Sequence, residues 1–360
     1  MDIRKKVVYI LGAGCSKEDK APLVREFFNV AFNEVLPKID KPQLKKRFLN
    51  IKEFRDLVLP QSNVEELLSY IDMQGIYKIK KQLKSPHFLR KDLIYLIAKT
   101  IEVNMGVGSS ENYANFKSNY LGSVTPIPTV ISFNWDIALD NTLISNSLDF
   151  SGESDTGVLL GIDYGTDFRY FTKKDKILKA NRNLSYKLLK LHGSLNWLFC
   201  KSCSSNNKYF ADGDKVMVRV SEGEKIECPE CKKNLIPVII PPTFNKLKDQ
   251  GIISLIKEVW VEAFNAIEDS ECIFIIGYSF PEDDVHFKLF LRSALYANYL
   301  KNKKTINIIA VNYKKYIDEK AEFESHYKKI IDIPEAEIRP KFHYLKFGEF
   351  ADSNIEKFMD

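Results

Sequence analysis

Four of the six cysteines in this 360-residue chain are spaced so that they could bind one metal ion. Cys200 and Cys203 form one Cys-x-x-Cys unit, and Cys228 and Cys231 form a second. Each unit can offer two thiolates to a tetrahedral ion, and residues 204–227 are long enough to bring the second unit back to the first. Four sulfur ligands would close the coordination sphere, so the spacing predicts a structural zinc site. Unligated cysteines are the alternative.

One of the five histidines stands where it could act as a general base. His192 ends the apolar stretch 187–191, which is typical of a buried strand, and Gly193 follows it. An imidazole in this place can exchange a proton near neutral pH. A purely structural histidine is the alternative. His286, which follows an acidic stretch, is expected at the surface or at an interface.

Polar side chains also follow the apolar residues 128–133. Asn134 and Asp136 stand at the carboxyl end of this predicted strand, and in open α/β sheets that end faces the ligand crevice. Asn134 can hydrogen-bond ribose hydroxyls or hold a water molecule, and Asp136 can accept a hydrogen bond from a carboxamide such as that of nicotinamide. An Asx turn that begins a helix at Ile137 is the alternative.

A glycine-rich turn follows the first apolar run, Val7–Leu11. Its glycines allow a sharp turn and a close approach of the backbone to a pyrophosphate, which the next helix N-terminus would face. The turn is not the usual G-x-G-x-x-G, and no acidic residue ends a second strand about 20 residues later, so an ordinary dehydrogenase site is disfavoured. A simple tight turn is the alternative. The residues of the turn are Gly12, Ala13, Gly14, Cys15 and Ser16, of which Cys15 is expected to be a packing residue rather than a reactive thiol.

The elements that must position these residues read as an α/β fold. Continuous apolar runs that predict buried parallel strands cover Val7–Leu11, 128–133, 187–191, Cys272–Ile276 and 305–311. Helical or irregular stretches separate the runs, which predicts a Rossmann-like, doubly wound parallel sheet. A helix over 245–269 leads back to the sheet, and the part from Lys314 onward is helical with a late strand near 342–347.

The chain divides into three predicted modules. The Rossmann-like domain comprises residues 1–22, 121–196 and 241–360, and a zinc-binding module comprises residues 197–240. Residues 23–120 form an all-helical insertion, in which Asn63 and Glu66 make a capping box and Ser85-Pro86 begins another helix. Residues 105–127 are expected to be rich in loops.

Composition narrows the class of protein. The chain is 45% hydrophobic and 28% charged, which is ordinary for a globular protein of two or three domain-sized units. The net charge of +5 is spread along the chain, so no specific nucleic-acid site is expected. No apolar run approaches a membrane span, and the N-terminal run is too short for a signal peptide. We expect a cytoplasmic protein with reduced cysteines.

These motifs, in this order, resemble the sirtuin family. Asn134 matches the asparagine essential for catalysis, His192 the catalytic histidine, and Asp136 the aspartate of the nicotinamide pocket. The resemblance implies a sirtuin-like NAD-binding domain with a zinc knuckle, in which NAD is the substrate and its nicotinamide–ribose bond is broken. The residues that match the family's NAD-binding elements are the turn Gly12, Ala13, Gly14, Cys15 and Ser16, together with Gly277, Ser279 and Asn312.

The chain departs from the family pattern in four places. Phe133 replaces the usual Gln and Tyr278 the usual Thr, the stretch 236–244 lacks the Phe-Gly-Glu element of deacylases, and 17–22 replaces a segment with a Phe-Arg pair. The departures resemble the sirtuin-like effectors of bacterial antiphage systems. They favour an NAD glycohydrolase over a protein deacylase or ADP-ribosyltransferase, and over a non-catalytic scaffold that binds NAD or ADP-ribose.

This resemblance also implies partners and control. We expect a homo-oligomer and either a partner ATPase, such as a HerA-like translocase, or a phage-derived trigger. An uncontrolled NAD hydrolase would poison its host, and the helical insertion is the candidate for its control.

Overall fold

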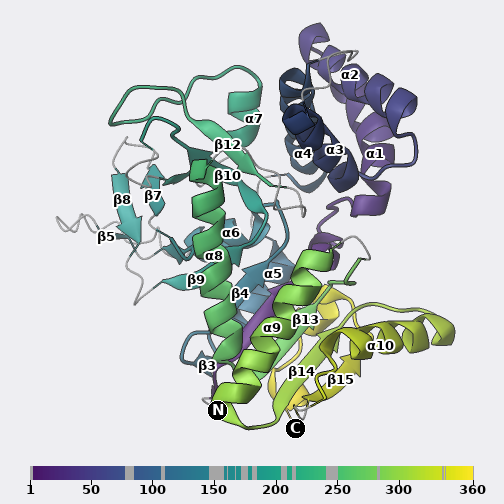
Figure 1. The fold of residues 1–360 in the computed structure, drawn as a ribbon, viewed down its shortest axis with the longest axis vertical. Coiled ribbons are helices and arrows are strands. Elements are labelled where there is room, and N and C mark those ends of the chain that lie inside the picture. Colours follow the sequence, from purple (N-terminus) through teal and green to yellow (C-terminus); the bar gives the residue numbers. More distant parts are fainter. Residues whose placement is uncertain are drawn as a thin grey trace.

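The core of the protein is a seven-stranded sheet in which every pair of neighbouring strands is parallel (Figure 1). The computed structural model describes residues 3–77, 85–106, 110–145, 158–159, 161–166, 168–171, 177–180, 185–203, 209–212, 216–240, 250–281, 284–334, 336 and 338–359. The strands lie in the order β15 (Ile338–His343), β14 (Ile306–Val311), β13 (Cys272–Ile276), β2 (Val7–Leu11), β4 (Thr129–Ser132), β9 (Tyr186–Lys190) and β6 (Ile162–Asp163).

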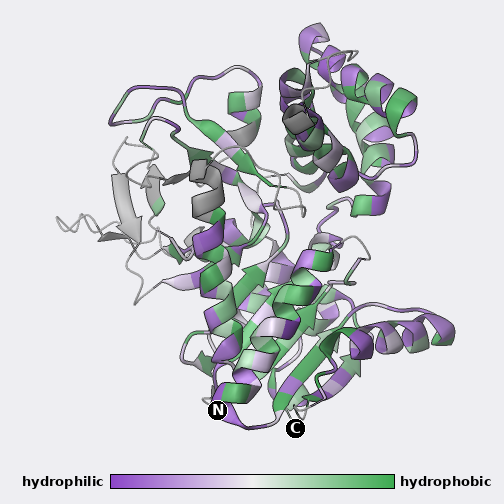
Figure 2. Ribbon diagram, in the orientation of Figure 1, coloured by the Kyte–Doolittle hydropathy of each residue, from purple (hydrophilic) through white to green (hydrophobic). Residues whose placement is uncertain are grey.

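The central strands form because their residues are apolar, and several are β-branched, so they can be buried on both faces. All five residues of β2 and of β13 are buried, and Figure 2 shows the central strands as almost uniformly hydrophobic. The five predicted strands and the doubly wound parallel arrangement are therefore confirmed. The late strand was predicted a few residues too far along, because β15 already ends at His343, paired with Val311.

Helices cover both faces of this sheet. Figure 1 shows α8 (Gln250–Glu268) and α9 (Val285–Asn302) in front of it and α5 (Glu111–Phe116) behind it. The remaining helices of this part are α6 (Ala138–Ser145), α10 (Ile317–Ile331), α11 (Phe347–Ala351) and α12 (Glu356–Met359). Of the helix predicted over 245–269, the part before residue 250 lies outside the described residues.

The loop-rich interpretation of residues 105–127 is wrong. Ser110 caps α5 by accepting a hydrogen bond from the backbone of Tyr113 at 3.2 Å, and a π-helical turn, Lys117–Leu121, continues the helix. Phe116 and Tyr120 pack edge-on against Tyr9 of β2. The helix is stabilised by this aromatic packing, which local sequence signals do not reveal.

A second, mixed sheet stands beside the first. Its strands lie in the order β12 (Ile236–Ile239), β10 (Gly193–Phe199), β11 (Tyr209–Asp212), β7 (Phe168–Phe171), β8 (Ile177–Ala180) and β5 (Val158–Leu159). The short helix α7 (Val216–Ser221) contacts β10. A two-residue turn joins β9 of the first sheet to β10 of the second. A separate pair, β1 (Ile3–Arg4) and β3 (Val124–Thr125), is parallel.

The helical part of the chain has a hydrophobic cluster of its own, which we call the helical cluster. Its helices are α1 (Phe27–Val30), α2 (Pro42–Val58), α3 (Val64–Tyr77) and α4 (Pro86–Met105), with short turns at Val24–Glu26, Ala31–Val35 and Leu36–Lys38. The capping box is present, since Asn63 accepts from the backbone of Glu66 and Glu66 from that of Asn63. Trp135 and Leu195 belong to this cluster and not to the core around the large sheet.

The predicted module boundaries stay predictions. Among the helices that the structure describes, none combines the length and the apolar character that a membrane span requires.

The chain changes direction across the sheet between β2 and β13. From β2 it continues to β4 on one side, and from β13 to β14 on the other, so the carboxyl ends of β2 and β13 flank a topological switch point. The turns after the two strands touch there, since the backbone of Gly14 donates to the carbonyl of Gly277 at 2.9 Å. A Cβ on Gly12 would lie 2.6 Å from that carbonyl oxygen, so only glycine fits.

We expect Gly12→Ala to lower the free energy of unfolding by about 3 kcal/mol, because neither backbone segment can move away from the added methyl group. Chemical denaturation measures this change. Gly122→Ala is the control, since its Cβ would lie 3.3 Å from Ser118 O at a φ of −80° and should cost less than about 1 kcal/mol. Equal stability of Gly12→Ala and the unchanged protein would show that the two turns do not need this contact.

Candidate functional site

The largest hollow described lies at the carboxyl ends of the strands, at the switch point. We call it the main cleft. It has a volume of about 1240 Å³, and turns after β2, β4, β9, β13 and β14 line it together with the helical cluster. Seven of the predicted site residues line it, namely Ala13, Gly14, Asn134, His192, Gly277, Ser279 and Asn312. The sheet therefore brings residues separated by about 300 positions to one volume.

Four of the residues predicted to bind NAD, namely Gly12, Cys15, Ser16 and Asp136, do not line the main cleft. The Sγ atom of Cys15 donates to the carbonyl of Ile276 at 3.2 Å, and burial raises the pKa of this thiol well above its usual value. Cys15 is thus a protonated packing residue beneath the turn.

The hydroxyl of Ser16 joins three side chains beneath the floor of the cleft. It donates to Oδ2 of Asp136 at 2.8 Å, accepts from Nδ2 of Asn134 at 3.2 Å, and lies 2.9 Å from the hydroxyl of Tyr113. A hydroxyl has one hydrogen and two lone pairs, so Tyr113 must be a donor and the capacity of Ser16 is full. Ser16 supports the site from below.

The amide of Asn134 is oriented by this arrangement. Nδ2 donates to the carbonyl of Gly12 at 3.0 Å as well as to Ser16, so both amide hydrogens are in use. The atom with which Asn134 can accept a hydrogen bond from a ligand in the main cleft is therefore Oδ1.

Asp136 does not line the main cleft, and it forms the Asx turn that was the alternative interpretation. Its Oδ1 accepts from the backbone of Ala138 at 3.1 Å, which is the Asx turn that begins α6. Asp136 also lines a second cavity of about 370 Å³, together with Asn141 and Met105. Burial raises the pKa of the Asp136 carboxyl, and the Lys190 ammonium counteracts this.

His192 lies in the turn that joins the two sheets. Gly193 after it has a φ of +75°, and a Cβ there would lie 2.4 Å from Val238 O, so the turn requires glycine. The imidazole is 4% exposed, and within the described part of the chain its Nε2 has no hydrogen-bond partner. Burial lowers the pKa of His192 to about 4, although Asp284 acts in the opposite direction. The ring is therefore neutral at pH 7 and can accept a proton.

Two of the departures from the sirtuin pattern contact each other beside this histidine. The rings of Phe133 and Tyr278 stack with centroids 4.5 Å apart, and Phe133 meets His192 edge-on at 5.2 Å. Tyr278 donates a hydrogen bond to Asp284, which caps α9 by accepting from Phe287 N. Phe133 and Tyr278 thus form an apolar wall beside His192.

Three residues of the site were missed by the sequence analysis. Asp284 lines the main cleft, and its signal was the N-cap position before an apolar helix. Lys190 is buried at the end of β9, and its signal was a charge between Leu189 and Leu191. Tyr113 had no signal, because α5 itself was not predicted. Of the stretch 236–244, residues from 241 onward lie outside the described part.

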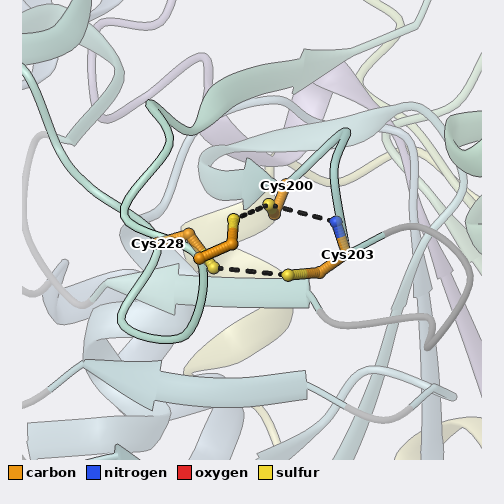
Figure 3. A group of neighbouring side chains, drawn as sticks. Cys200, Cys203 and Cys228 are labelled. Atoms are coloured by element: carbon orange, nitrogen blue, oxygen red, sulfur yellow. Dashed lines mark hydrogen bonds between the residues drawn. The ribbon is translucent and has the colours of Figure 1, made fainter.

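The four predicted zinc ligands converge at one point. The Sγ atoms of Cys200, Cys203, Cys228 and Cys231 all lie within 4.8 Å of one another. Sγ separations are 3.4 Å for Cys200 and Cys231 and 3.7 Å for Cys203 and Cys228, while tetrahedral zinc with Zn–S bonds of about 2.3 Å places its sulfurs about 3.8 Å apart. Figure 3 shows Cys200, Cys203 and Cys228 facing one another. The geometry fits a closed, structural zinc site.

Comparison with solved structures relates the chain to Sir2 proteins. A serine-to-alanine variant of a Sir2 homologue in complex with ADP-ribose is 14% identical, over 97% of this chain and 89% of that one, with a TM-score of 0.41. A structure that concerns the mechanism and regulation of Sir2 enzymes is 14% identical, over the same shares of the chains, with a TM-score of 0.37. Sir2 with an inhibitor, 2′-O-acetyl-ADP-ribose and a deacetylated peptide is 13% identical, over 96% and 90%, with a TM-score of 0.39. No protein-family model and no curated protein matches the sequence.

Cys228→Ser should release zinc and lower the melting temperature by several degrees, because a closed four-thiolate site contributes folding energy. Metal analysis of the purified protein and a thermal scan measure the two effects. Cys272→Ser is the matched control, since Cys272 is buried outside the cluster. It should lower stability yet keep its zinc, whereas equal zinc in Cys228→Ser and the unchanged protein would contradict the assignment.

His192 should make stability depend on pH between about 4 and 6.5. The unfolded chain binds a proton below pH 6.5 and the folded chain only near pH 4, so this contribution is complete above pH 6.5 and is lost as the pH falls. The unchanged protein should lose up to about 3 kcal/mol relative to His192→Gln between pH 7.5 and pH 4. Denaturation of both proteins at the two pH values tests this, and the comparison cancels acid release of zinc. Parallel losses would contradict it.

Proposed function

We propose that this protein hydrolyses NAD to nicotinamide and ADP-ribose. The observation that carries the proposal is the convergence of a glycine turn, Asn134 and His192 on one cleft at the topological switch point. Glycine turns at this place in α/β sheets bind phosphates, and a neutral histidine beside an asparagine can handle a ribose and a water molecule.

The proposed roles follow from the position of each side chain. Gly14 and Gly277, whose turns touch, would let the pyrophosphate approach the backbone closely. Asn312, at the end of β14, would serve the adenosine ribose. Oδ1 of Asn134 would accept a hydrogen bond from the nicotinamide ribose or from the attacking water.

The chemistry requires a base. The bond between C1′ of the ribose and the nicotinamide nitrogen breaks, nicotinamide leaves with the electron pair, and water adds to the oxocarbenium-like ribose. His192 would take the proton that this water loses. The cavity lined by Asp136 would receive the carboxamide of nicotinamide. The cysteine cluster would hold zinc as a structural element at the opposite end of β10 from the turn that carries His192.

Two features favour water over an acyl-lysine peptide as the acceptor. The stretch 236–244, which follows the cysteines, lacks the deacylase element Phe-Gly-Glu. Phe133 and Tyr278 form an apolar wall beside His192 in place of the polar side chains of deacylases. Through the sequence resemblance, this proposal includes a cellular role in antiphage defence, an oligomer, and a HerA-like ATPase or a phage-derived trigger. The helical insertion is the candidate for control on its position alone.

Purified protein incubated with NAD should release nicotinamide and ADP-ribose, and Asn134→Ala and His192→Ala should each slow this by at least about 100-fold while remaining folded. Chromatography of the products is the measurement. His286→Ala is the matched control, because His286 lines a separate groove between α8 and α9.

The same assay separates the competing functions. Nicotinamide release that requires an acyl-lysine peptide would identify a deacylase, and NAD binding without turnover in the oligomer with its partner would identify a scaffold. Turnover by His192→Ala at the unchanged rate would remove this histidine from the mechanism.

A further inference from the structure

A buried lysine connects the two loops that carry the proposed site. Lys190, the last residue of β9, is 1% exposed. Its ammonium donates to the backbone carbonyl of Asp136 at 2.5 Å, to Oδ2 of Asp140 at 3.0 Å and to Oγ of Ser194 at 2.6 Å. Three donors thus meet three acceptors, so the charge is satisfied within the protein.

The counterion is itself anchored. Oδ1 of Asp140 accepts from the hydroxyl of Tyr164 and from Nδ2 of Asn196. Asp140 is 1% exposed, so the pair is out of contact with water. An ion pair in such a place contributes little net stability, which points to a role in arranging the site.

Lys190 lies between the two proposed catalytic residues. It precedes His192 by two residues and binds the carbonyl of Asp136, which follows Asn134 by two residues. It therefore fixes the end of β9 to the loop after β4. The side chain of Asp136 is in turn hydrogen-bonded to Ser16, and Ser16 is hydrogen-bonded to Asn134.

The direction of these hydrogen bonds depends on the charge of Asp136. Ser16 has one hydrogen, so it can accept from both Asn134 and Tyr113 only while that hydrogen is given to Asp136. An ionised Asp136 has no hydrogen to donate and therefore keeps this direction. A protonated Asp136 could donate to Ser16, and Ser16 would then turn its own hydrogen toward Asn134. The amide of Asn134 would then keep only one of its two orienting hydrogen bonds, the one to the carbonyl of Gly12.

We propose that Lys190 is a positioning residue for the hydrolysis of NAD: its buried ammonium, anchored by Asp140, keeps Asp136 a carboxylate and thereby holds Oδ1 of Asn134 toward the main cleft. The proposal rests on the proposed function for its consequence in turnover, whereas the state of Asp136 is independent of any substrate.

The charges around Asp136 agree with this role. Burial raises the pKa of Asp136, Lys190 lowers it, the hydrogen bonds from Ser16 and Ala138 lower it further, and Asp140 raises it. Cys15 and Tyr113 face it from the turn and from α5. The other ionisable groups that share its cavity are Glu18, Asp19, Lys20, Glu102 and Glu111. The positive charge that lowers the pKa of Asp136 is that of Lys190.

The direct test is a carbon NMR titration of aspartate-labelled protein, in which Asp136 is identified by comparison with Asp136→Asn. We expect Asp136 to titrate at least about one pH unit higher in Lys190→Met than in the unchanged protein. Lys190→Gln, which has no charge but can still donate to the carbonyl of Asp136, should shift the titration in the same direction if Lys190→Met folds poorly.

Turnover gives the second readout. Lys190→Met should lower kcat about tenfold at pH 7 with KM for NAD within about twofold, and its kcat should rise again toward high pH as Asp136 ionises. Ser194→Ala is the matched control, because it removes one acceptor of Lys190 and keeps the charge. It should leave the pH profile unchanged.

The outcomes separate the two proposals. An unshifted Asp136 titration in both folded, uncharged variants would overturn the role of Lys190, whatever their turnover. A shifted titration in a protein whose unchanged form never cleaves NAD would support the role of Lys190 in arranging the loop and would overturn the proposed function.

Discussion

The whole site depends on a contact between two backbone turns that have no side chains at the point of contact. Gly12 and Gly14 lie against Gly277, and a Cβ on any of the three would come within 2.9 Å of an opposing backbone atom. This contact holds the turns after β2 and β13 side by side at the carboxyl edge of the sheet, so that both can face the same ligand. It also sets where the carbonyl of Gly12 lies, and that carbonyl orients the amide of Asn134. The close packing of the glycine turns thus determines how the amide of Asn134 is oriented.

Beneath these turns the buried side chains are polar, although apolar side chains could be buried there without any need for hydrogen-bond partners. Ser16, Asp136 and Lys190 are each buried, and each is hydrogen-bonded to its neighbour in space. Such a network adds little stability, but it allows few arrangements, because every hydrogen has an assigned acceptor. The apolar wall of Phe133 and Tyr278 stands on the other side of Asn134 and His192. The main cleft therefore has a floor of hydrogen-bonded polar groups and an apolar wall on one side.

Most of the large sheet could be predicted from the sequence, but only part of the candidate site could. The strands were predictable because burial on both faces requires apolar runs, and the four cysteines because zinc ligands have a characteristic spacing. The helix α5 was not predictable, since its aromatic residues are stabilised by Tyr9, which is distant in the chain. Asp136 was placed at the correct strand end, but its direction away from the main cleft depends on Ser16 and on the Asx turn. Such contacts are set by packing between elements, which one sequence does not contain.

Trp135 has a consequence of a different kind. Its neighbours in the chain, Asn134 and Asp136, belong to the floor of the site, yet its indole packs in the helical cluster. The loop is thus shared between the helical cluster and the part of the protein built on the large sheet. When the helices open, the indole loses its packing, so the backbone amides of this loop should become exchangeable with solvent in the same cooperative step. Loosening of the helices, by heat or by a bound partner, should therefore lower the local order at the end of β4. This requires no rigid movement of the helices relative to the sheet.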